Sequence, residues 1–509
     1  MTTVTIPVID VGPCFAGRPS ALERTAAELR AALEGVGFFI IVNHGVERDL
    51  IARTFGPGKL TTPPGHQIIE TGLFKLAAVT GENRYRELAR FFLEQRGRPQ
   101  GHPLYGPYNQ DHQPVIEQKE AVGHAVRAAY MYSAMVDEAA LDGDPLYREA
   151  VQRIWDDVVS RKLYLTGGIG ARHKGEAFGD AFELPNRTAY AETCASIANV
   201  YWNYRMFLLS GDGKYVDVLE RTLYNATLAG VSLKGDTFFY PNPLESDGRT
   251  PFDHGALTRQ PWFDSSCCPT NLGRFIPSIG DYVYATRPDT LFVNLFVASQ
   301  ASVQTPDLDL GIVQETRYPW DGRVTLRLTP RRPRAFTVKV RIPGWARGRP
   351  VPSDLYHYVG ASAPAYEVRV NGRRVEAPLA DGYAVLDRTW TTGDKITLLL
   401  PMTVRRVVAD ERVVDDRGKV ALERGPLVYC VEGIDNGGSV LDMVVPDGAG
   451  FRVEDRPGLL HGVTVLRAAV SDGQGRPRPL LAVPYYAWSH RGVGEMAVWL
   501  PRGEIGPLP

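Results

Sequence analysis

The stretch Ser265-Ser-Cys-Cys-Pro-Thr-Asn271, read with Glu192-Thr-Cys194 upstream, is the part of the sequence that the rest of the chain must be arranged around. These two stretches hold three of the five cysteines among 509 residues, and one carboxylate lies two residues before the first of them. Thiolates with a carboxylate suit zinc, a tetrahedral ion that prefers sulfur and nitrogen and also accepts oxygen. A disulfide between the neighbours Cys267 and Cys268 is disfavoured, because its Cα atoms must lie farther apart than one ordinary peptide step. Three buried, inert cysteines are the alternative, since free cysteine packs as a small hydrophobic residue.

Both stretches are expected to lie at the beginnings of helices. Residues two apart on a regular helix point to nearly opposite sides, so Glu192 and Cys194 can reach one ion only from an irregular first turn. The preceding Pro185-Asn-Arg-Thr188 supplies stop and cap residues, which predicts a helix start near residues 189–192. Pro269-Thr-Asn271 can open a second helix, whose N-terminal dipole lowers the pKa of a nearby thiol. We therefore expect a thiolate, the nucleophilic form of cysteine, at neutral pH.

The composition excludes several classes of protein. A hydrophobic content of 44% in 509 residues allows two to four domains. A net charge of −1 offers no basic field for nucleic acid. Five cysteines, an odd and sparse number, do not make a disulfide framework and favour a reducing compartment. The N-terminus has no features of a secretion signal, and its longest apolar run, Val36–Val42, is too short to cross a membrane. We expect a cytoplasmic protein with neither nucleic acid nor membrane as a partner.

The pattern along the chain predicts a multidomain protein that is helical first and β-rich afterwards. Residues 1–55 are expected to form a strand-helix-strand unit, with strands at Thr5–Asp10 and Gly37–Val42 around a helix from Ser20 to Leu33. A run of Gly and Pro over 55–65 marks its end. Residues 56–285 show helical periodicity. The helices expected there are Ile68–Val79, Tyr85–Gln95, Gln118–Leu141, Tyr147–Arg161, Ala191–Leu209 and Tyr215–Ala226.

The sequence pattern of residues 286–509 is typical of strands joined by turns. Stretches such as Leu291–Val297 and Phe336–Ile342 alternate or run apolar, and Asn371-Gly372 is a typical hairpin turn. This predicts one or two β-sandwich domains. Such a region after a helical body can bind glycans or can buttress the helices, and the absence of an evident cluster of exposed aromatic residues favours the buttress.

Glu176 is a candidate general acid. It lies in His173-Lys-Gly-Glu-Ala-Phe-Gly179, a loop bracketed by glycines with a phenylalanine two residues on. Apolar surroundings raise the pKa of a carboxyl group, which is what a general acid working near neutral pH needs. A solvated surface glutamate is the alternative interpretation.

Over about 65–500 the sequence resembles the glycoside hydrolase family 127 β-L-arabinofuranosidases. The resemblance rests on eight motifs in order: GHQIIETGLFKL, YGPYNQDHQPVIEQKEAVGHAVRAAYMYSAM, TGGIGARHKGEAFGDAFELPN, AYAETCASIANVYWN, ERTLYN, FFYPNPLES, CCPTNLGRFIPS and YYAWSHRGVGEMAVWLP. It implies an (α/α)6-barrel-like catalytic domain followed by β-sandwich domains, and hydrolysis with retention of configuration. Such a barrel needs twelve helices, about twice the number counted in 56–285, so the barrel is expected to be incomplete at its N-terminal end.

The same resemblance assigns roles to residues. The family's ligands for Zn2+ fall on Glu192, Cys194, Cys267 and Cys268, its nucleophile on Cys267 and its acid/base on Glu176. It also implies that the sugar pocket is lined by His124, Glu220 and Tyr240. The implied substrate is a small molecule or oligosaccharide that ends in β-L-arabinofuranose, the implied mechanism is double displacement, and a homodimer is compatible with the pattern.

Residues 1–50 are similar to the N-terminal segment of isopenicillin-N-synthase-like, iron- and 2-oxoglutarate-dependent oxygenases, in the start IPVID and the end VGFFIIVNHGV. Such enzymes bind iron with a His-x-Asp and a distant His. No His in this chain is followed two residues later by Asp or Glu, so oxygenase chemistry is disfavoured. The main alternative to a glycosidase is a catalytically impaired carbohydrate-binding or scaffold protein with a structural zinc site.

Overall fold

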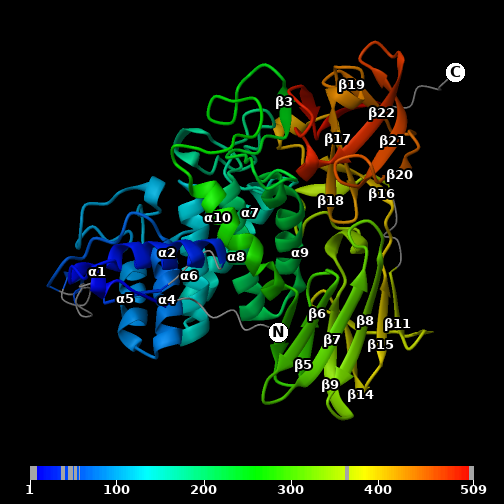
Figure 1. Ribbon diagram of the computed structural model, residues 1–509. Helices are drawn as coiled ribbons and strands as arrows, with labels where there is room; N and C mark the ends of the chain where they lie inside the picture. Colours follow the sequence, from blue (N-terminus) through cyan, green and yellow to red (C-terminus); the bar gives the residue numbers. More distant parts are fainter. Residues whose placement is uncertain are drawn as a thin grey trace.

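The computed structural model describes residues 8–35, 40–43, 50, 54–56, 58–360 and 366–503. In Figure 1 the helices occupy one side of the molecule, and two β regions lie above one another on the other side. The layout expected from the sequence, helical first and β-rich afterwards, is confirmed. No helix in the described ranges is long and apolar enough to cross a membrane.

The N-terminal unit is a small strand-helix-strand element. Its strands β1 (Val8–Asp10) and β2 (Ile40–Val42) pair in parallel, with Val8 opposite Ile40, and the chain between them forms α1 (Gly12–Phe15) and α2 (Ala21–Gly35). Residues 5–7 and 37–39 of the two expected strands lie outside the described residues.

The helical region is built from helical hairpins, and three of its helices end at a glycine. α4 ends at Gly81, α6 at Gly143 and α8 at Gly211, and all three glycines have positive φ, which side chains disfavour. Asp144 and Asp212 follow two of these glycines and cap the next helix by accepting a backbone N–H. The helices are α4 (Ile68–Thr80), α5 (Asn83–Gln95), α6 (Ala125–Asp142), α7 (Pro145–Arg161), α8 (Thr193–Ser210), α9 (Gly213–Thr222) and α10 (Cys267–Phe275).

α6 and α8 form the centre of the helical region. α6 packs against α4, α7 and α8, while α8 packs against α9 and α10. Between them lie the rings of Tyr132 and Trp202, which are fully buried with centroids 4.9 Å apart. The described residues show seven helices of this kind, and the expectation that the barrel is incomplete relative to its family stays a prediction.

The first β unit is a sandwich of two sheets, one with the order β12-β11-β15-β8-β7-β6 and one with the order β13-β14-β9-β5-β4. Strand β8 alternates between the core and the surface, since Val324, Leu326 and Leu328 are buried between polar neighbours. The strands are β4 (Tyr284–Arg287), β5 (Thr290–Val293), β6 (Ser299–Gln304), β7 (Asp309–Thr316), β8 (Arg323–Pro330), β9 (Arg334–Arg341), β11 (Glu367–Val370), β12 (Arg373–Arg374), β13 (Leu379–Ala380), β14 (Tyr383–Trp390) and β15 (Lys395–Leu399).

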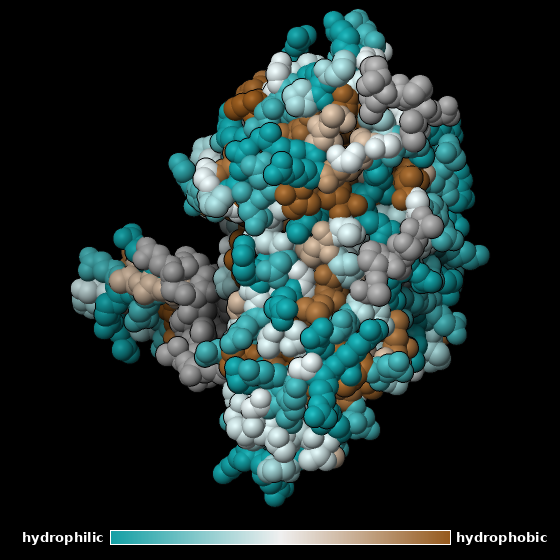
Figure 2. All heavy atoms as spheres, turned by 90° about the vertical axis from the view of Figure 1, so that its right-hand side faces the viewer, coloured by the Kyte–Doolittle hydropathy of each residue, from teal (hydrophilic) through white to brown (hydrophobic). Residues whose placement is uncertain are grey.

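The second β unit is an eleven-stranded sheet that also ties in segments from earlier in the chain. One edge strand, β10, comes from the stretch between β9 and β11, and the other, β3, comes from the loop before α10. Hydrophilic residues cover most of the face on the β side of the molecule, with hydrophobic ones in scattered patches (Figure 2). The strands are β3 (Glu245–Asp247), β10 (Tyr356–Tyr358), β16 (Val404–Ala409), β17 (Lys419–Arg424), β18 (Leu427–Glu432), β19 (Met443–Pro446), β20 (Arg452–Arg456), β21 (Val463–Asp472), β22 (Pro477–Pro484), β23 (Glu495–Ala497) and β24 (Leu500–Gly503).

Candidate active site

The two cysteine-bearing stretches meet at the N-terminal ends of α8 and α10. α8 begins at Thr193, so Glu192 is its N-cap with extended backbone and Cys194 lies in its first turn. This irregular start lets both side chains face one point, as the sequence argument required. α10 begins at Cys267, which puts Cys267 and Cys268 in its first turn, two residues earlier than Pro269 suggested.

Glu192, Cys194, Cys267 and Cys268 form one compact cluster in which the ligand atoms all lie within 4.8 Å of one another. The Oε1 atom of Glu192 is 3.4 Å from the sulfur of Cys268 and 3.7 Å from that of Cys267. The two neighbouring sulfurs are 3.9 Å apart, so they are not bonded, and all five cysteines of the chain are free. Cys267 is the most exposed of the four.

The donor set fits a zinc ion. Zn–S bonds of about 2.3 Å in a tetrahedron place two sulfurs about 3.8 Å apart, close to the spacing seen here. The second carboxylate oxygen of Glu192, Oε2, is buried without a hydrogen-bond partner among the described residues, and leaving such an atom unpaired is costly. Burial raises the pKa of Glu192 and of Cys268, so without a cation both prefer their protonated forms. A cation that displaces these protons would satisfy the orphaned oxygen.

Hydrogen bonds from Cys194 and Cys268 lower the pKa of Cys267, and Tyr240 contributes in the same direction. The Tyr240 hydroxyl lies 2.9 Å from the sulfur of Cys267. Its ring packs against those of His254 and Phe263. These contacts keep Cys267 the most acidic of the three thiols, and it is also the exposed one.

Glu176 lies near the cluster, within 4.8 Å of Glu192, in a strained turn. It has a φ of 50° in the short 3-10 turn Lys174–Glu176, a conformation that residues other than glycine adopt rarely. Its Oε2 is 2.7 Å from Nε2 of His124, and Tyr190 donates its hydroxyl proton to Oε1 at 2.8 Å. The hydrogen bond from His124 lowers the pKa of Glu176. The sequence-based expectation of a raised pKa in apolar surroundings is therefore wrong for this geometry, because two donors face the carboxylate.

His124 is held in a defined orientation. It is the N-cap of α6, and its Nδ1 accepts the backbone N–H of Arg127 at 3.4 Å. The ring proton then belongs on Nε2, the atom that faces Glu176. His124, Glu176 and Glu192 offer ligand atoms within 4.8 Å of one another, so the glutamate and the cysteine cluster border the same space.

Two residues near the site were not assigned from the sequence. Tyr190 fixes Glu176, and burial lowers the pKa of His66 to about 4, which leaves it neutral. The ring of His66 lies 6.5 Å from that of His124 and 6.1 Å from that of Tyr130. Tyr190 and His66 both belong to motifs that carry the family resemblance, and those motifs were the signal in the sequence that could have identified them.

Glu220 does not join this group. It is fully buried at the boundary between α9 and the first β unit, where Arg341 pairs with it at 2.5 Å and Tyr318 donates to it at 2.8 Å. Asp217 accepts a further bond from the same Arg341. Its place does not support the expectation that Glu220 lines the sugar pocket, because its carboxylate already serves a contact between domains.

Three family models match successive parts of the chain. The beta-L-arabinofuranosidase GH127 catalytic domain matches residues 50–281, the GH127 middle domain 290–402, and the glycoside hydrolase family 127 C-terminal domain 404–501. A fourth model, the N-terminal domain of non-haem dioxygenases in morphine synthesis, matches residues 6–59. Both resemblances seen in the sequence are confirmed.

Individual proteins agree with these matches. A non-reducing end beta-L-arabinofuranosidase of Bifidobacterium longum is 36% identical over 89% of this chain and 74% of its own length. The solved GH127 beta-arabinofuranosidase BT3674 is 45% identical, with a TM-score of 0.84 over 97% of this chain and 76% of that one. Ara127N-Se, a GH127 beta-L-arabinofuranosidase from Geobacillus stearothermophilus, is 40% identical, with a TM-score of 0.82 over 96% and 81%. The sexual differentiation process protein isp7 of Schizosaccharomyces pombe is 43% identical over 54 residues, which are 11% of this chain and 14% of that protein.

Proposed function

The chain belongs to glycoside hydrolase family 127, and we propose that it is a retaining β-L-arabinofuranosidase with Cys267 as nucleophile and Glu176 as acid/base. The observation that carries the proposal is the convergence of these two groups on one space. Glu176 offers an oxygen within 4.8 Å of Glu192, whose own Oε1 is 3.7 Å from the sulfur of Cys267. Retaining glycosidases place their two reactive groups about 5–5.5 Å apart, one on each side of the sugar.

In the first step Cys267, as a thiolate, attacks the anomeric carbon. The carbon–sulfur bond forms while the bond to the departing oxygen breaks, and Glu176 gives its proton to that oxygen. In the second step Glu176, now a carboxylate, removes a proton from water, whose oxygen bonds to the anomeric carbon as the thiolate leaves. The hydrogen bond from His124 lowers the pKa of Glu176, and the negative charge of Cys267 offsets part of that fall while the thiolate is present.

The neighbours of Glu176 support the second step. Hydrogen bonds from His124 and Tyr190 stabilise its carboxylate, the form that takes the proton from water. Tyr240 holds the sulfur of Cys267 from the other side. We propose that Glu192, Cys194, Cys267 and Cys268 hold a zinc ion, which when bound keeps the cysteines deprotonated and fixed in place.

The substrate follows from the relatives and from the site. We propose that the enzyme takes a carbohydrate or a small glycoside with a terminal β-L-arabinofuranose, and that His124 and Tyr240 contact the sugar from the walls of the opening. The free cysteines favour a reducing compartment such as the cytoplasm.

The test uses an aryl β-L-arabinofuranoside and measures released L-arabinose by chromatography, with zinc per chain by elemental analysis. Wild type is expected to hydrolyse it with retention and Cys267→Ala to lose activity, while Glu176→Gln loses activity most clearly on an alkyl β-L-arabinofuranoside, whose leaving group needs the acid. Both variants should keep the fold. Cys14→Ala changes a cysteine in the N-terminal unit and is the matched control. Sugar binding without turnover in wild type would instead indicate a catalytically impaired carbohydrate-binding protein.

A further inference from the structure

A polar cavity lies far along the chain from the cysteine cluster, on the β side of the molecule. It has a volume of about 500 Å³ and is bordered by the loop from Gly348 to Asp354, by β10 and by Arg405 of β16. Cavities of this size accommodate small organic ligands. The residues of the proposed catalytic site do not line it.

Two arginines in this cavity have no acidic partner among the described residues. Arg405 lies with its guanidinium 4.1 Å from the centroid of the Tyr358 ring, and Arg349 is exposed. Within the described ranges neither guanidinium donates a hydrogen bond or forms an ion pair. The acidic residue nearest to Arg405 in the sheet register, Glu423, is already bound by Arg221 and by the hydroxyl of Tyr358. An anion in the cavity would therefore meet guanidinium groups with free donors, which suit carboxylate well.

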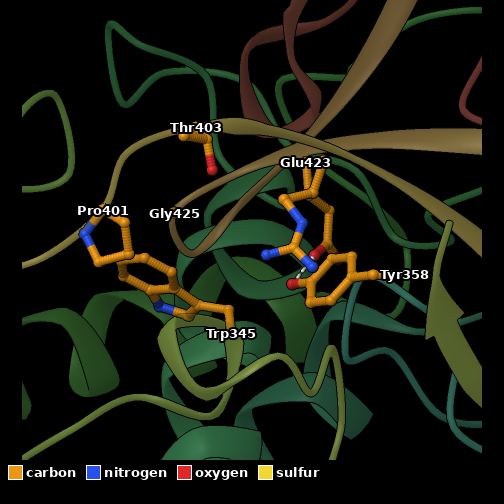
Figure 3. Close-up of a pocket in the computed structure, with 7 residues that line it drawn as sticks. Trp345, Tyr358, Pro401, Thr403, Glu423 and Gly425 are labelled. Carbon is orange, nitrogen blue, oxygen red and sulfur yellow. Dashed lines mark hydrogen bonds between the residues drawn. The ribbon is translucent and has the colours of Figure 1, made fainter. Parts of the chain in front are cut away.

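Tyr358 and Arg405 of this cavity also line a small neighbouring hollow. Figure 3 shows Trp345 and Tyr358 on different sides of this hollow, with the hydrogen bond of 2.8 Å from Tyr358 to Glu423. That bond and the pair between Glu423 and Arg221 fix the ring of Tyr358 beneath Arg405. The guanidinium is thus held against a rigid aromatic surface, so little side-chain entropy is lost when it binds a ligand.

The remaining lining favours a sugar over a simple anion. β10 is an edge strand of its sheet, so its outer backbone groups have no strand partner in the described structure. Asp354 is exposed at the cavity and, like the side chain of His357, can bond to hydroxyl groups. A carboxylate in the lining that also holds the two arginines disfavours dense polyanions and accepts hydroxyl donors. This combination of one cationic anchor for a carboxylate and several partners for hydroxyl groups matches a uronic acid residue.

We propose that this cavity, named here the β10 cavity after its edge strand, binds an acidic oligosaccharide through one uronate carboxylate. Arg349 and Arg405 hold the carboxylate, while Asp354 and the backbone of β10 bind sugar hydroxyls. The site lies outside the catalytic opening, so it anchors an acidic glycan chain without taking part in hydrolysis. It goes beyond the proposed glycosidase activity and does not require it.

Isothermal titration of the full chain with trigalacturonate tests the proposal, with a neutral trisaccharide and inorganic sulfate as comparison ligands. Wild type is expected to bind trigalacturonate and not the neutral sugar. Arg349→Gln and Arg405→Gln should each weaken binding by about tenfold or more, since each removes a charge-assisted contact. Arg331→Gln, which removes an exposed arginine of the first β unit, should leave it unchanged.

Asp354→Asn separates a sugar site from a simple anion site. It should weaken trigalacturonate binding, and it should not weaken sulfate binding because one negative charge is removed. Absence of trigalacturonate binding in wild type, equal affinity for sulfate, or equal affinity in all variants would overturn the proposal. Hydrolysis of a small aryl arabinofuranoside should be the same in all these variants, so a failure here is distinct from a failure of the proposed enzyme activity.

Discussion

The hydroxyl oxygen of Tyr240 lies 2.9 Å from the sulfur of Cys267, and the backbone N–H of the same tyrosine is held at 2.8 Å by the buried carboxylate of Asp253. The position of the tyrosine is therefore set from within the loop that precedes α10. This contact links the proposed nucleophile to a group that can donate a proton in a hydrogen bond without titrating near neutral pH.

We expect Tyr240→Phe to keep the fold and the metal content but to slow hydrolysis. A hydrogen bond to a charged group contributes about 1.5–3 kcal/mol, so kcat/KM should fall by about 10- to 100-fold. The measurement is kcat/KM on an aryl β-L-arabinofuranoside together with zinc per chain. An unchanged rate with normal zinc content would show that the hydroxyl does not assist the thiolate.

The role of Glu176 predicts a dependence on the leaving group. Glu176→Gln keeps the shape of the side chain and removes the proton, and general acid catalysis contributes about 10²- to 10⁴-fold. The loss in kcat/KM should be large for an alkyl glycoside and much smaller for an aryl glycoside whose phenolate leaves unaided. Rates measured for a series of leaving groups would settle this, and an equal loss for all of them would contradict the assignment.

The cluster predicts a link between metal and stability. Cys268 is fully buried, so Cys268→Ala should remove a ligand, lower zinc per chain below that of wild type and lower the melting temperature. Treatment of wild type with a chelator should reproduce both effects, and added zinc should reverse them. Cys14→Ala is again the control, and zinc-free wild type that melts at the same temperature would speak against a bound ion.

Much of the helical layout and of the cluster could be predicted from local sequence. Periodicity placed α4 and α7 within about two residues of their observed ends. The helix expected from Gln118 instead begins at Ala125, because Gly123 adopts a φ of 71° and leaves no room for a Cβ beside the carbonyl of Pro107. Such a close approach between segments has no signature in a single sequence.

The residues around Glu176 show the same limit. Its lowered pKa depends on His124 and Tyr190, which arrive from other segments, and neither periodicity nor composition indicates that they point at the carboxylate. Glu220 was assigned by motif alone, and its partner Arg341 comes from β9, 121 positions later. The pKa of Glu176 and the position of Glu220 therefore both depend on partners that are distant in the sequence, which local patterns do not reveal.

The position of Glu220 leads to a prediction that distinguishes a structural role of this residue from a role in sugar binding. Glu220→Gln removes one buried charge beside Arg341 and leaves Asp217 as the acidic partner of this cation among the described residues. Breaking a buried ion pair costs about 3–5 kcal/mol, and the remaining Asp217 should reduce that loss. We expect a lower free energy of unfolding in urea with KM unchanged at a temperature where the variant is folded. A raised KM with normal stability would return Glu220 to the sugar pocket.

Asp416 predicts how stability depends on pH. Burial raises the pKa of this carboxyl to about 7, and the opposing effects of Asn186 and Lys419 do not cancel it, while Asp415 and Glu245 add to the rise. The unfolded chain has the ordinary pKa of 3.8, so the folded state holds the proton over the window between these values. The contribution of Asp416 to the free energy of unfolding is therefore fully present below about pH 4 and is lost above about pH 7. Between these values it falls by at most about 1.4 kcal/mol for each pH unit.

Asp416→Asn should remove this dependence, because the amide cannot ionise and its oxygen can still accept the bond of 2.7 Å that Asn186 now donates to the carboxylate. At pH 8 the variant should therefore be more stable than wild type, and the two should converge as the pH approaches 4. Urea unfolding at several pH values measures the difference, with Asp387→Asn on an exposed part of β14 as the control that changes one charge without burial. A variant that is less stable than wild type at pH 8 would mean that Asp416 is charged in the folded protein and that its carboxylate stabilises the junction between Asn186 and the second β unit.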